Sequence, residues 1–175
     1  MAGNDLGLIH IYTGDGKGKT TAAVGLAVRA SGAGKRVAFA QFMKGRPTSE
    51  IAQLEKLGIT VIKAGTVTKF VPYMTDAERA QCAEESAAGF EAAAAMAENL
   101  DVLLLDEIIS AVTTGMVPEA RLLEFLRSKP AHLEVVLTGR DVPSDIAELA
   151  DYLSDIKAVK HPYEKGISAR KGIEM

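Results

Sequence analysis

The sequence predicts an α/β fold in which a mostly parallel sheet is covered by helices on both faces. Strand-like and helix-like segments alternate about six times along the 175 residues, as in sheets built from β-α-β units. The segment 101–106 is almost continuously apolar, which is typical of a strand buried on both faces. A glycine-rich turn joins the first strand to the first helix, as in many folds of this class.

The individual elements follow from hydrophobic period and from start and stop signals. Strands are expected at residues 8–13, 36–42, 59–63, 101–106, 133–138 and 153–159. Helices are expected at residues 20–31, 49–57, 75 to about 99, 118–127 and 144–150. Thr75 followed by Glu78 is a capping-box signature for the long helix. Residues 64–74 and 160–175 show no regular period, and no linker divides the chain, so one domain over residues 1–175 is expected.

The composition of the chain argues against several classes of function. Apolar residues make up 47% of the chain, charged residues 25%, and the net charge is −3, so nucleic acid is not an expected partner. Cys82 is the single cysteine, which excludes an internal disulfide and a zinc set based on several cysteines. Residues 1–7 lack a signal-peptide pattern and no apolar run approaches about 18 residues. We therefore expect a cytoplasmic protein without a membrane span.

The strongest functional signal is the phosphate loop, the run Thr-Gly-Asp-Gly-Lys-Gly-Lys-Thr at residues 13–20 between the first strand and helix. Its glycines allow backbone N–H groups to converge on phosphate oxygens, and the helix N-terminus adds partial positive charge. Lys19 supplies a full charge to the phosphates, and the Thr20 hydroxyl can ligate Mg²⁺. The common form begins with glycine where Thr13 stands, so a variant ATP-binding loop is expected; a turn without a ligand is the alternative.

Further charged residues are expected near this loop. Asp106 and Glu107 end an apolar strand, at the edge where open α/β sheets bind ligands, and one of them should serve the metal. Arg140 follows the next apolar strand and either neutralises a phosphate or carboxylate or is a solvated surface arginine. Arg29, within the first helix, either reaches toward phosphate or faces solvent. These residues extend the predicted site along the sheet edge.

Other residues have two interpretations each. Met43 and Lys44 follow the second strand at the same sheet edge, so a site role and a surface position are both open. His10 is expected to be a satisfied histidine of the first strand, and Cys82 a structural residue of the long helix. The alanine-rich run 87–97 allows close helix packing, within the chain or at a dimer interface.

Taken together, these segments resemble the P-loop type of ATP:corrinoid adenosyltransferase. The resemblance covers nearly the whole chain from about Gly7 and is carried by residues 12–25, 41–45, 105–107, 138–140, 159–163 and 166–174. Phosphate loops are common, whereas Gln-Phe-Met-Lys-Gly at 41–45 and Ala-Arg-Lys-Gly-Ile-Glu at the end of the tail are much more specific.

The resemblance implies a RecA-like P-loop NTPase fold, a homodimer, and transfer of the 5′-deoxyadenosyl group of ATP to cobalt(I) of a corrinoid with release of triphosphate. It also implies ATP bound reversed in the loop, and an electron donor such as a reductase that makes cobalt(I). Because cobalt(I) attacks C5′ directly, the protein must align the attack and stabilise charge on the leaving triphosphate.

Site residues follow from this chemistry. The backbone of Gly14, Gly16 and Gly18, together with Lys19, Mg²⁺ and Arg29, is expected to bind the triphosphate. Lys19 and Glu107 are expected to act in catalysis, with Thr20 and Glu107 as the metal-side groups. Further candidates for nucleotide contacts are Asp15, Lys17 and Arg140.

The loop before the long helix departs from the family pattern. Relatives often carry a Phe-x-Trp pair there, which is thought to displace the lower ligand of cobalt. Here Phe70 matches, Pro72 stands at the tryptophan position and Tyr73 follows one place later. Phe70 is expected to act on the corrinoid, the alternative being a core aromatic, and Pro72 favours a precursor without the lower ligand over cobalamin. The stretch before the first strand is also shorter than the helical arm of some relatives.

Two other functions fit the phosphate loop. A RecA-like ATPase or phosphotransferase would use Glu107 to orient water or an acceptor hydroxyl and would release ADP. A regulatory module would bind nucleotide without turnover. The variant loop and the tail favour the adenosyltransferase.

Overall fold

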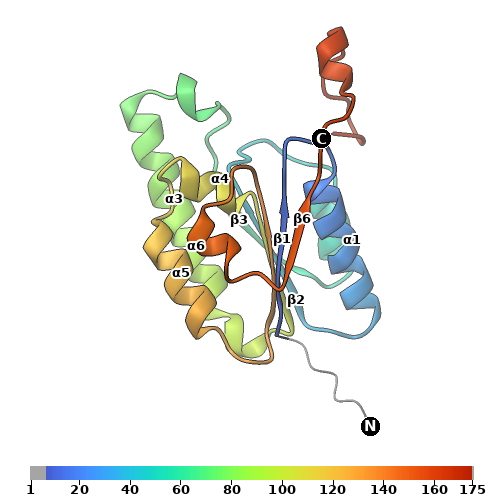
Figure 1. Ribbon diagram of the computed structural model, residues 1–175, viewed down its shortest axis with the longest axis vertical. Coiled ribbons are helices and arrows are strands. Elements are labelled where there is room, and N and C mark those ends of the chain that lie inside the picture. The colour runs from blue at the N-terminus through green and yellow to red at the C-terminus, as the bar shows by residue number, and fades with distance from the viewer. Residues whose placement is uncertain (1–6, 175) are drawn as a thin grey trace.

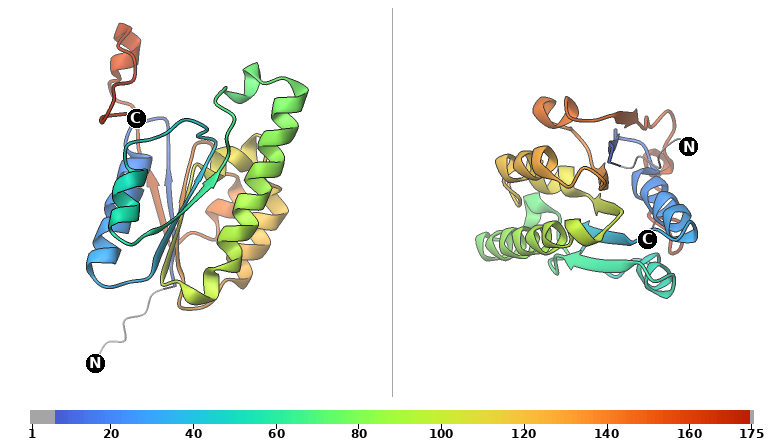
Figure 2. Two further views of the ribbon diagram at one scale, coloured as in Figure 1. Left: turned by 180° about the vertical axis from the view of Figure 1, so that it is seen from behind. Right: turned by 90° about the horizontal axis from the view of Figure 1, so that it is seen from below.

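The computed structural model describes residues 7–174 and shows one parallel sheet between two layers of helices (Figures 1 and 2). The strands are β1 (Ile9–Thr13), β2 (Val37–Phe42), β3 (Thr60–Ala64), β4 (Val102–Asp106), β5 (Glu134–Thr138) and β6 (Tyr152–Asp155). Their order in the sheet is β3-β2-β4-β5-β1-β6, and each neighbouring pair is parallel. The predicted α/β fold with a parallel sheet is confirmed.

The helices divide between the two faces of the sheet (Figure 2). They are α1 (Lys19–Gly32), α2 (Ile51–Lys56), α3 (Asp76–Ala95), α4 (Ile108–Thr113), α5 (Glu119–Ser128) and α6 (Ser144–Ala147), with short 3₁₀ turns η1 (Val71–Tyr73), η2 (Ala97–Asn99) and η3 (Pro162–Lys165). Helices α1 and α2 cover one face, and α3 to α6 pack on the other. The sequence did not predict α4, and the long helix ends earlier than expected, at Ala95. No helix in the described part of the chain is long and apolar enough to span a membrane.

Strand β4 lies near the middle of the sheet and is buried on both faces. Leu103 and Leu105 belong to the core beneath α3, α4 and α5, whereas Val102 and Leu104 belong to the core beneath α1 and α2. Because side chains alternate along a strand, a strand between two helix layers needs apolar residues at every position. The continuous apolar run predicted this position correctly.

The start of α3 is fixed by the predicted capping box. The Thr75 side chain accepts a hydrogen bond from the Glu78 N–H, and the Glu78 carboxylate accepts one from the Thr75 N–H at 2.8 Å. The Lys69 ammonium, 2.7 Å from Glu78, and this N–H of Thr75 hold the pKa of Glu78 at about 2. The cap therefore also ties Lys69, and with it the loop before α3, to the start of the helix.

Close packing of the alanine-rich helix is observed within the chain. Gly89 of α3 lies against Ala64 at the end of β3, where an added Cβ would come 2.2 Å from the Ala64 Cβ. Cys82, Phe90 and Ala93 are buried on the same helix, as expected for a structural cysteine. Because Gly89 has no side chain, the backbone of α3 can lie directly against Ala64 of the sheet.

Two glycine-to-alanine substitutions test this packing. Gly89→Ala should lower the free energy of unfolding by about 1–3 kcal/mol, because the new methyl group overpacks the contact with Ala64. Gly25→Ala is the matched control: Gly25 lies in α1 with nothing within 4 Å of an added Cβ, so this variant should gain about 0.5–1 kcal/mol. Urea denaturation measures both, and equal effects would contradict the packing argument.

Candidate functional site

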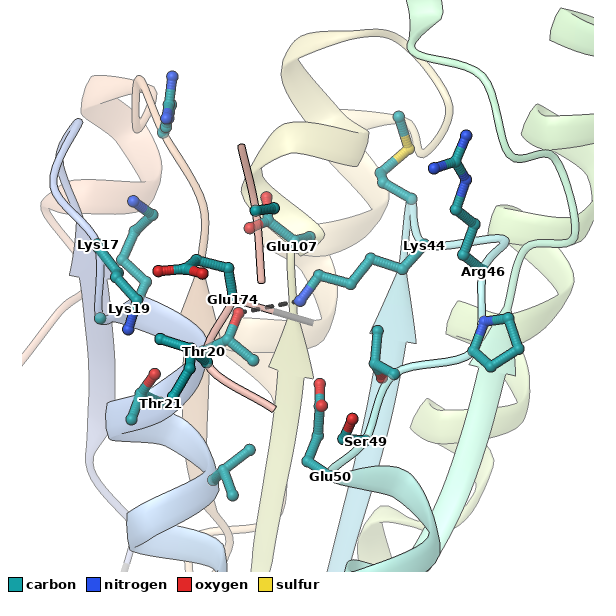
Figure 3. Close-up of a pocket in the computed structure, with 18 of the residues that line it drawn as sticks. Lys17, Lys19, Thr20, Thr21, Lys44, Arg46, Ser49, Glu50, Glu107 and Glu174 are labelled. Carbon is teal, nitrogen blue, oxygen red and sulfur yellow. Dashed lines mark hydrogen bonds between the residues drawn. The ribbon is translucent and has the colours of Figure 1, made fainter. Parts of the chain in front are cut away.

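A pocket of about 770 Å³ opens at the edge of the sheet where the parallel strands end (Figure 3). Its walls come from the phosphate loop and α1, the segment after β2, the loop before α3, and the C-terminal tail. The predicted site residues that line the pocket are Asp15, Gly16, Lys17, Gly18, Lys19, Thr20, Phe70, Glu107 and Arg140. Gly14 and Arg29 are predicted for the site and lie outside this lining.

The phosphate loop is docked on the segment that follows β6. The Gly16 N–H donates to the Ile156 carbonyl at 2.7 Å, and the Asp15 carboxylate accepts from the Ala158 N–H at 3.0 Å. An added Cβ would lie 2.4 Å from the Ile156 carbonyl oxygen at Gly14 and 2.6 Å from it at Gly16. These two glycines are therefore required by a contact within the chain. Gly18 differs, because an added Cβ there would meet no atom within 4 Å. Its φ of 130° is nevertheless one that favours glycine.

Lys19 is buried beneath the loop that precedes it. Its ammonium donates to the carbonyl oxygens of Gly14 at 2.7 Å and Gly16 at 2.8 Å. Burial, and then the nearby Arg140 guanidinium, lower the pKa of Lys19 below its ordinary value. An anion in the loop would oppose both effects, because an opposite charge favours the ammonium form.

A cluster of polar side chains, the Asp106 cluster, consists of Thr20, Lys44, Asp106 and Thr138. The Asp106 side chain is 0% exposed, and its Oδ1 accepts from the hydroxyls of Thr20 at 2.9 Å and Thr138 at 2.8 Å. Its Oδ2 accepts from the Lys44 ammonium at 2.8 Å, and the same ammonium donates to Thr20 at 3.0 Å. The cluster joins the start of α1 to the ends of β2, β4 and β5.

Glu107 lines the pocket but has different partners. Its backbone is left-handed, with φ 62°, and its N–H donates to the Thr138 hydroxyl at 2.8 Å. Its carboxylate accepts from the Ser110 hydroxyl at 2.6 Å. The acid in contact with Thr20 is therefore Asp106, which the sequence offered as one of two alternatives but did not favour for the metal side.

Arg29 requires a correction. It is exposed, in the last turn of α1, and does not line the pocket. At a helical rise of about 1.5 Å per residue, it lies about 15 Å further along the axis than Lys19. The fold thus separates Arg29 from the phosphate loop within one chain.

Phe70 and Arg140 both face the pocket. Phe70 is 81% exposed, so it is not a core aromatic, whereas Tyr73 is 76% exposed and lies outside the lining. One guanidinium nitrogen of Arg140 lies 3.5 Å from the carbonyl oxygen of Asp15. Arg140 is therefore a neighbour of the phosphate loop as well as an exposed residue.

The C-terminal tail supplies wall residues that sequence periodicity could not place. His161, Ala169, Gly172, Ile173 and Glu174 line the pocket. The Arg170 guanidinium, 2.9 Å from the Glu174 carboxylate, and the Arg170 N–H hold the pKa of Glu174 at about 2. The family resemblance was the signal that pointed to this tail.

The geometry defines a class of protein. A strand, a glycine-rich loop and a helix hold a buried lysine and a threonine next to an aspartate at the end of a neighbouring strand, which is the arrangement of P-loop nucleotide-binding proteins. Residues 7–174 contain no group of three or more His, Cys, Asp or Glu side chains that could hold a metal by themselves.

Comparison with known proteins identifies the family. Residues 5–175 match the family model of ATP:corrinoid adenosyltransferase BtuR/CobO/CobP. The chain is 37% identical over 99% of its length to the corrinoid adenosyltransferase of Escherichia coli strain K12, covering 88% of that protein. It is 36% identical to corrinoid adenosyltransferase CobA of Salmonella typhimurium, again over 99% of this chain and 88% of that protein. The chain belongs to the ATP:corrinoid adenosyltransferase family.

The contribution of the Asp106 carboxylate to the stability of the fold can be tested by substitution. Asp106→Asn should lower the free energy of unfolding by about 1–3 kcal/mol, because the amide NH₂ opposes a hydroxyl or ammonium donor. Asp141→Asn is the control: Asp141 is exposed at φ 54°, where asparagine is well tolerated, so its change should stay within about 0.5 kcal/mol. Thermal or urea unfolding of both variants measures the difference, and indistinguishable stabilities would contradict the role given to Asp106.

Proposed function

We propose that this protein transfers the 5′-deoxyadenosyl group of ATP to cobalt(I) of a corrinoid and releases inorganic triphosphate. The observation that carries the proposal is the contact of Thr20 with buried Asp106 beside Lys19, in a chain of this family. The relatives from Escherichia coli and Salmonella typhimurium are named corrinoid adenosyltransferases. In this reaction the Co–C5′ bond forms while the C5′–O bond breaks, and the bonding electrons leave with the triphosphate.

The phosphate loop binds the triphosphate in this proposal. The backbone N–H groups of the loop, apart from that of Gly16, which is bonded to the Ile156 carbonyl, and the Lys19 ammonium stabilise the charge that grows on the leaving group. Lys17 and Arg140, both on the pocket wall, add positive charge. Asp15 acts through the loop, because its carboxylate is bonded to the Ala158 N–H. We leave Arg29 out of the site because of its distance from the loop.

Mg²⁺ fits the Asp106 cluster. The cation prefers oxygen ligands and is usually held by one or two protein groups together with phosphates and waters. The Thr20 hydroxyl, which lines the pocket, and the buried Asp106 carboxylate bonded to it offer such a pair, and Thr138 orients the carboxylate. Glu107 would serve through water. When bound, Mg²⁺ supplies positive charge to the phosphate oxygens.

The corrinoid approaches from the open side of the pocket. Phe70 presents an exposed aromatic face on that wall, which suits contact with a flat macrocycle. Because Pro72 replaces the usual tryptophan and Tyr73 lies outside the pocket lining, we favour a corrinoid precursor that has no lower ligand to displace.

We also infer a homodimer, a separate electron donor and a cytoplasmic location. The homodimer and the donor rest on the family resemblance. For the homodimer there is one supporting observation, the exposed Tyr152 and Leu153 on edge strand β6. The residues on which the expectation about the N-terminal arm rests lie mainly outside the described part of the chain.

A product assay tests the reaction. Purified protein, MgATP and chemically reduced corrinoid are mixed without oxygen, and the visible spectrum follows Co–C bond formation while chromatography follows triphosphate. We expect both products in equal amounts, and a loss of about 100-fold or more in kcat/KM for Lys19→Ala, because a preorganised charge on the leaving group is removed.

Two further variants sharpen the assay. Lys56→Ala removes the same charge at the end of α2, outside the pocket, and should keep full activity. Phe70→Ala should raise KM for the corrinoid and leave nucleotide binding unchanged. Release of ADP and phosphate with an unchanged corrinoid spectrum would contradict the proposal and indicate an ATPase instead.

A further inference from the structure

Lys44 lines the pocket, yet it has no role in the reaction proposed above. It is the second residue after β2, and the residue between them, Met43, adopts a left-handed backbone with φ 58°. A left-handed conformation is uncommon for a residue other than glycine and turns the chain sharply. Figure 3 shows the Lys44 side chain reaching across the pocket floor to Thr20.

Lys44 compensates a buried charge. The Asp106 side chain is fully buried, and a buried carboxylate without a positive partner is strongly unfavourable. Among residues 7–174, the Lys44 ammonium is the one cationic group within ion-pair distance of Asp106, and its own side chain is 26% exposed. The exposed part of the side chain gives the ammonium a route out of the cluster.

The ammonium also occupies the ligands that Mg²⁺ would need. It lies 2.8 Å from Oδ2 of Asp106 and 3.0 Å from the Thr20 hydroxyl oxygen. That hydroxyl donates its proton to Asp106, so Lys44 uses one of the lone pairs available for a metal. Mg²⁺ binds oxygen at about 2.0–2.1 Å, and two cations cannot share this space.

We propose that Lys44 is a built-in cation that holds the position between Thr20 and Asp106 until the metal arrives with the triphosphate. This inference rests on the proposed function, which places Mg²⁺ at the same two groups. A free divalent ion must displace Lys44 and leave its ammonium without an anionic partner. A metal–nucleotide complex brings phosphate oxygens that accept the displaced ammonium. Lys44 is therefore a positioning residue that makes metal binding depend on nucleotide.

Metal affinity of the nucleotide-free protein tests this role. Mn²⁺ is the probe, because its free and bound forms are distinguished by electron paramagnetic resonance. We expect Lys44→Met and Lys44→Gln to bind Mn²⁺ at least about tenfold more tightly than the unchanged chain when no nucleotide is present, since a competing charge is removed. Lys56→Met removes an equal charge outside the pocket and should bind Mn²⁺ like the unchanged chain.

The outcomes are separable. Lys44→Gln keeps a hydrogen-bond donor on a side chain one atom shorter, so we expect it to preserve the fold even if Lys44→Met does not. Thermal unfolding checks both variants. Folded Lys44 variants that bind Mn²⁺ no better than the Lys56 control would overturn the inference. So would a gain that survives addition of Asp106→Asn, because the metal would then be elsewhere. Since Mn²⁺ binding is measured without corrinoid, either failure leaves the product assay to judge the proposed function.

Discussion

The site depends on the hydrogen bonds and the ion pair that the buried Asp106 carboxylate makes. A carboxylate without water must be surrounded by donors, and here they come from α1, the end of β5 and the segment after β2. The hydrogen bonds that satisfy the Asp106 carboxylate therefore hold the start of α1, the ends of β4 and β5, and Lys44 in fixed positions relative to each other. The arrangement of Thr20, Lys44 and Thr138 around Asp106 is thus a consequence of burial at the end of β4.

The parallel sheet explains why these residues meet. All its strands end at the same edge, so residues distant in sequence converge beneath the phosphate loop. Thr13, where most phosphate loops have glycine, is the last residue of β1 and pairs with Asp155 of β6. Its carbonyl accepts from the Ile156 N–H at 2.9 Å. The variant residue thus belongs to the strand, and the loop begins one residue later, at Gly14.

Much of the fold could be predicted because the strands and most helices have clear periods and end signals. Helix α4 was missed because its six residues are too few for a helical period to show. It begins after the left-handed backbone of Glu107, which composition does not reveal. The phosphate-loop residues were found because their spacing is local. Arg29 was included in the predicted site for its charge, although its place ten residues after Lys19 in the same helix puts it about 15 Å further along the axis. That Asp106 rather than Glu107 contacts Thr20 depends on side-chain direction, which only the structure supplies.

The central claim is tested most directly by a crystal structure of the complete chain with Mg²⁺ and an unreactive ATP analogue. We expect the triphosphate within residues 14–18, the metal bonded to the Thr20 hydroxyl and near Asp106, and the Lys44 ammonium moved from Asp106 to a phosphate oxygen. A nucleotide bound elsewhere, or a bound metal with the Lys44–Asp106 ion pair still intact, would contradict it.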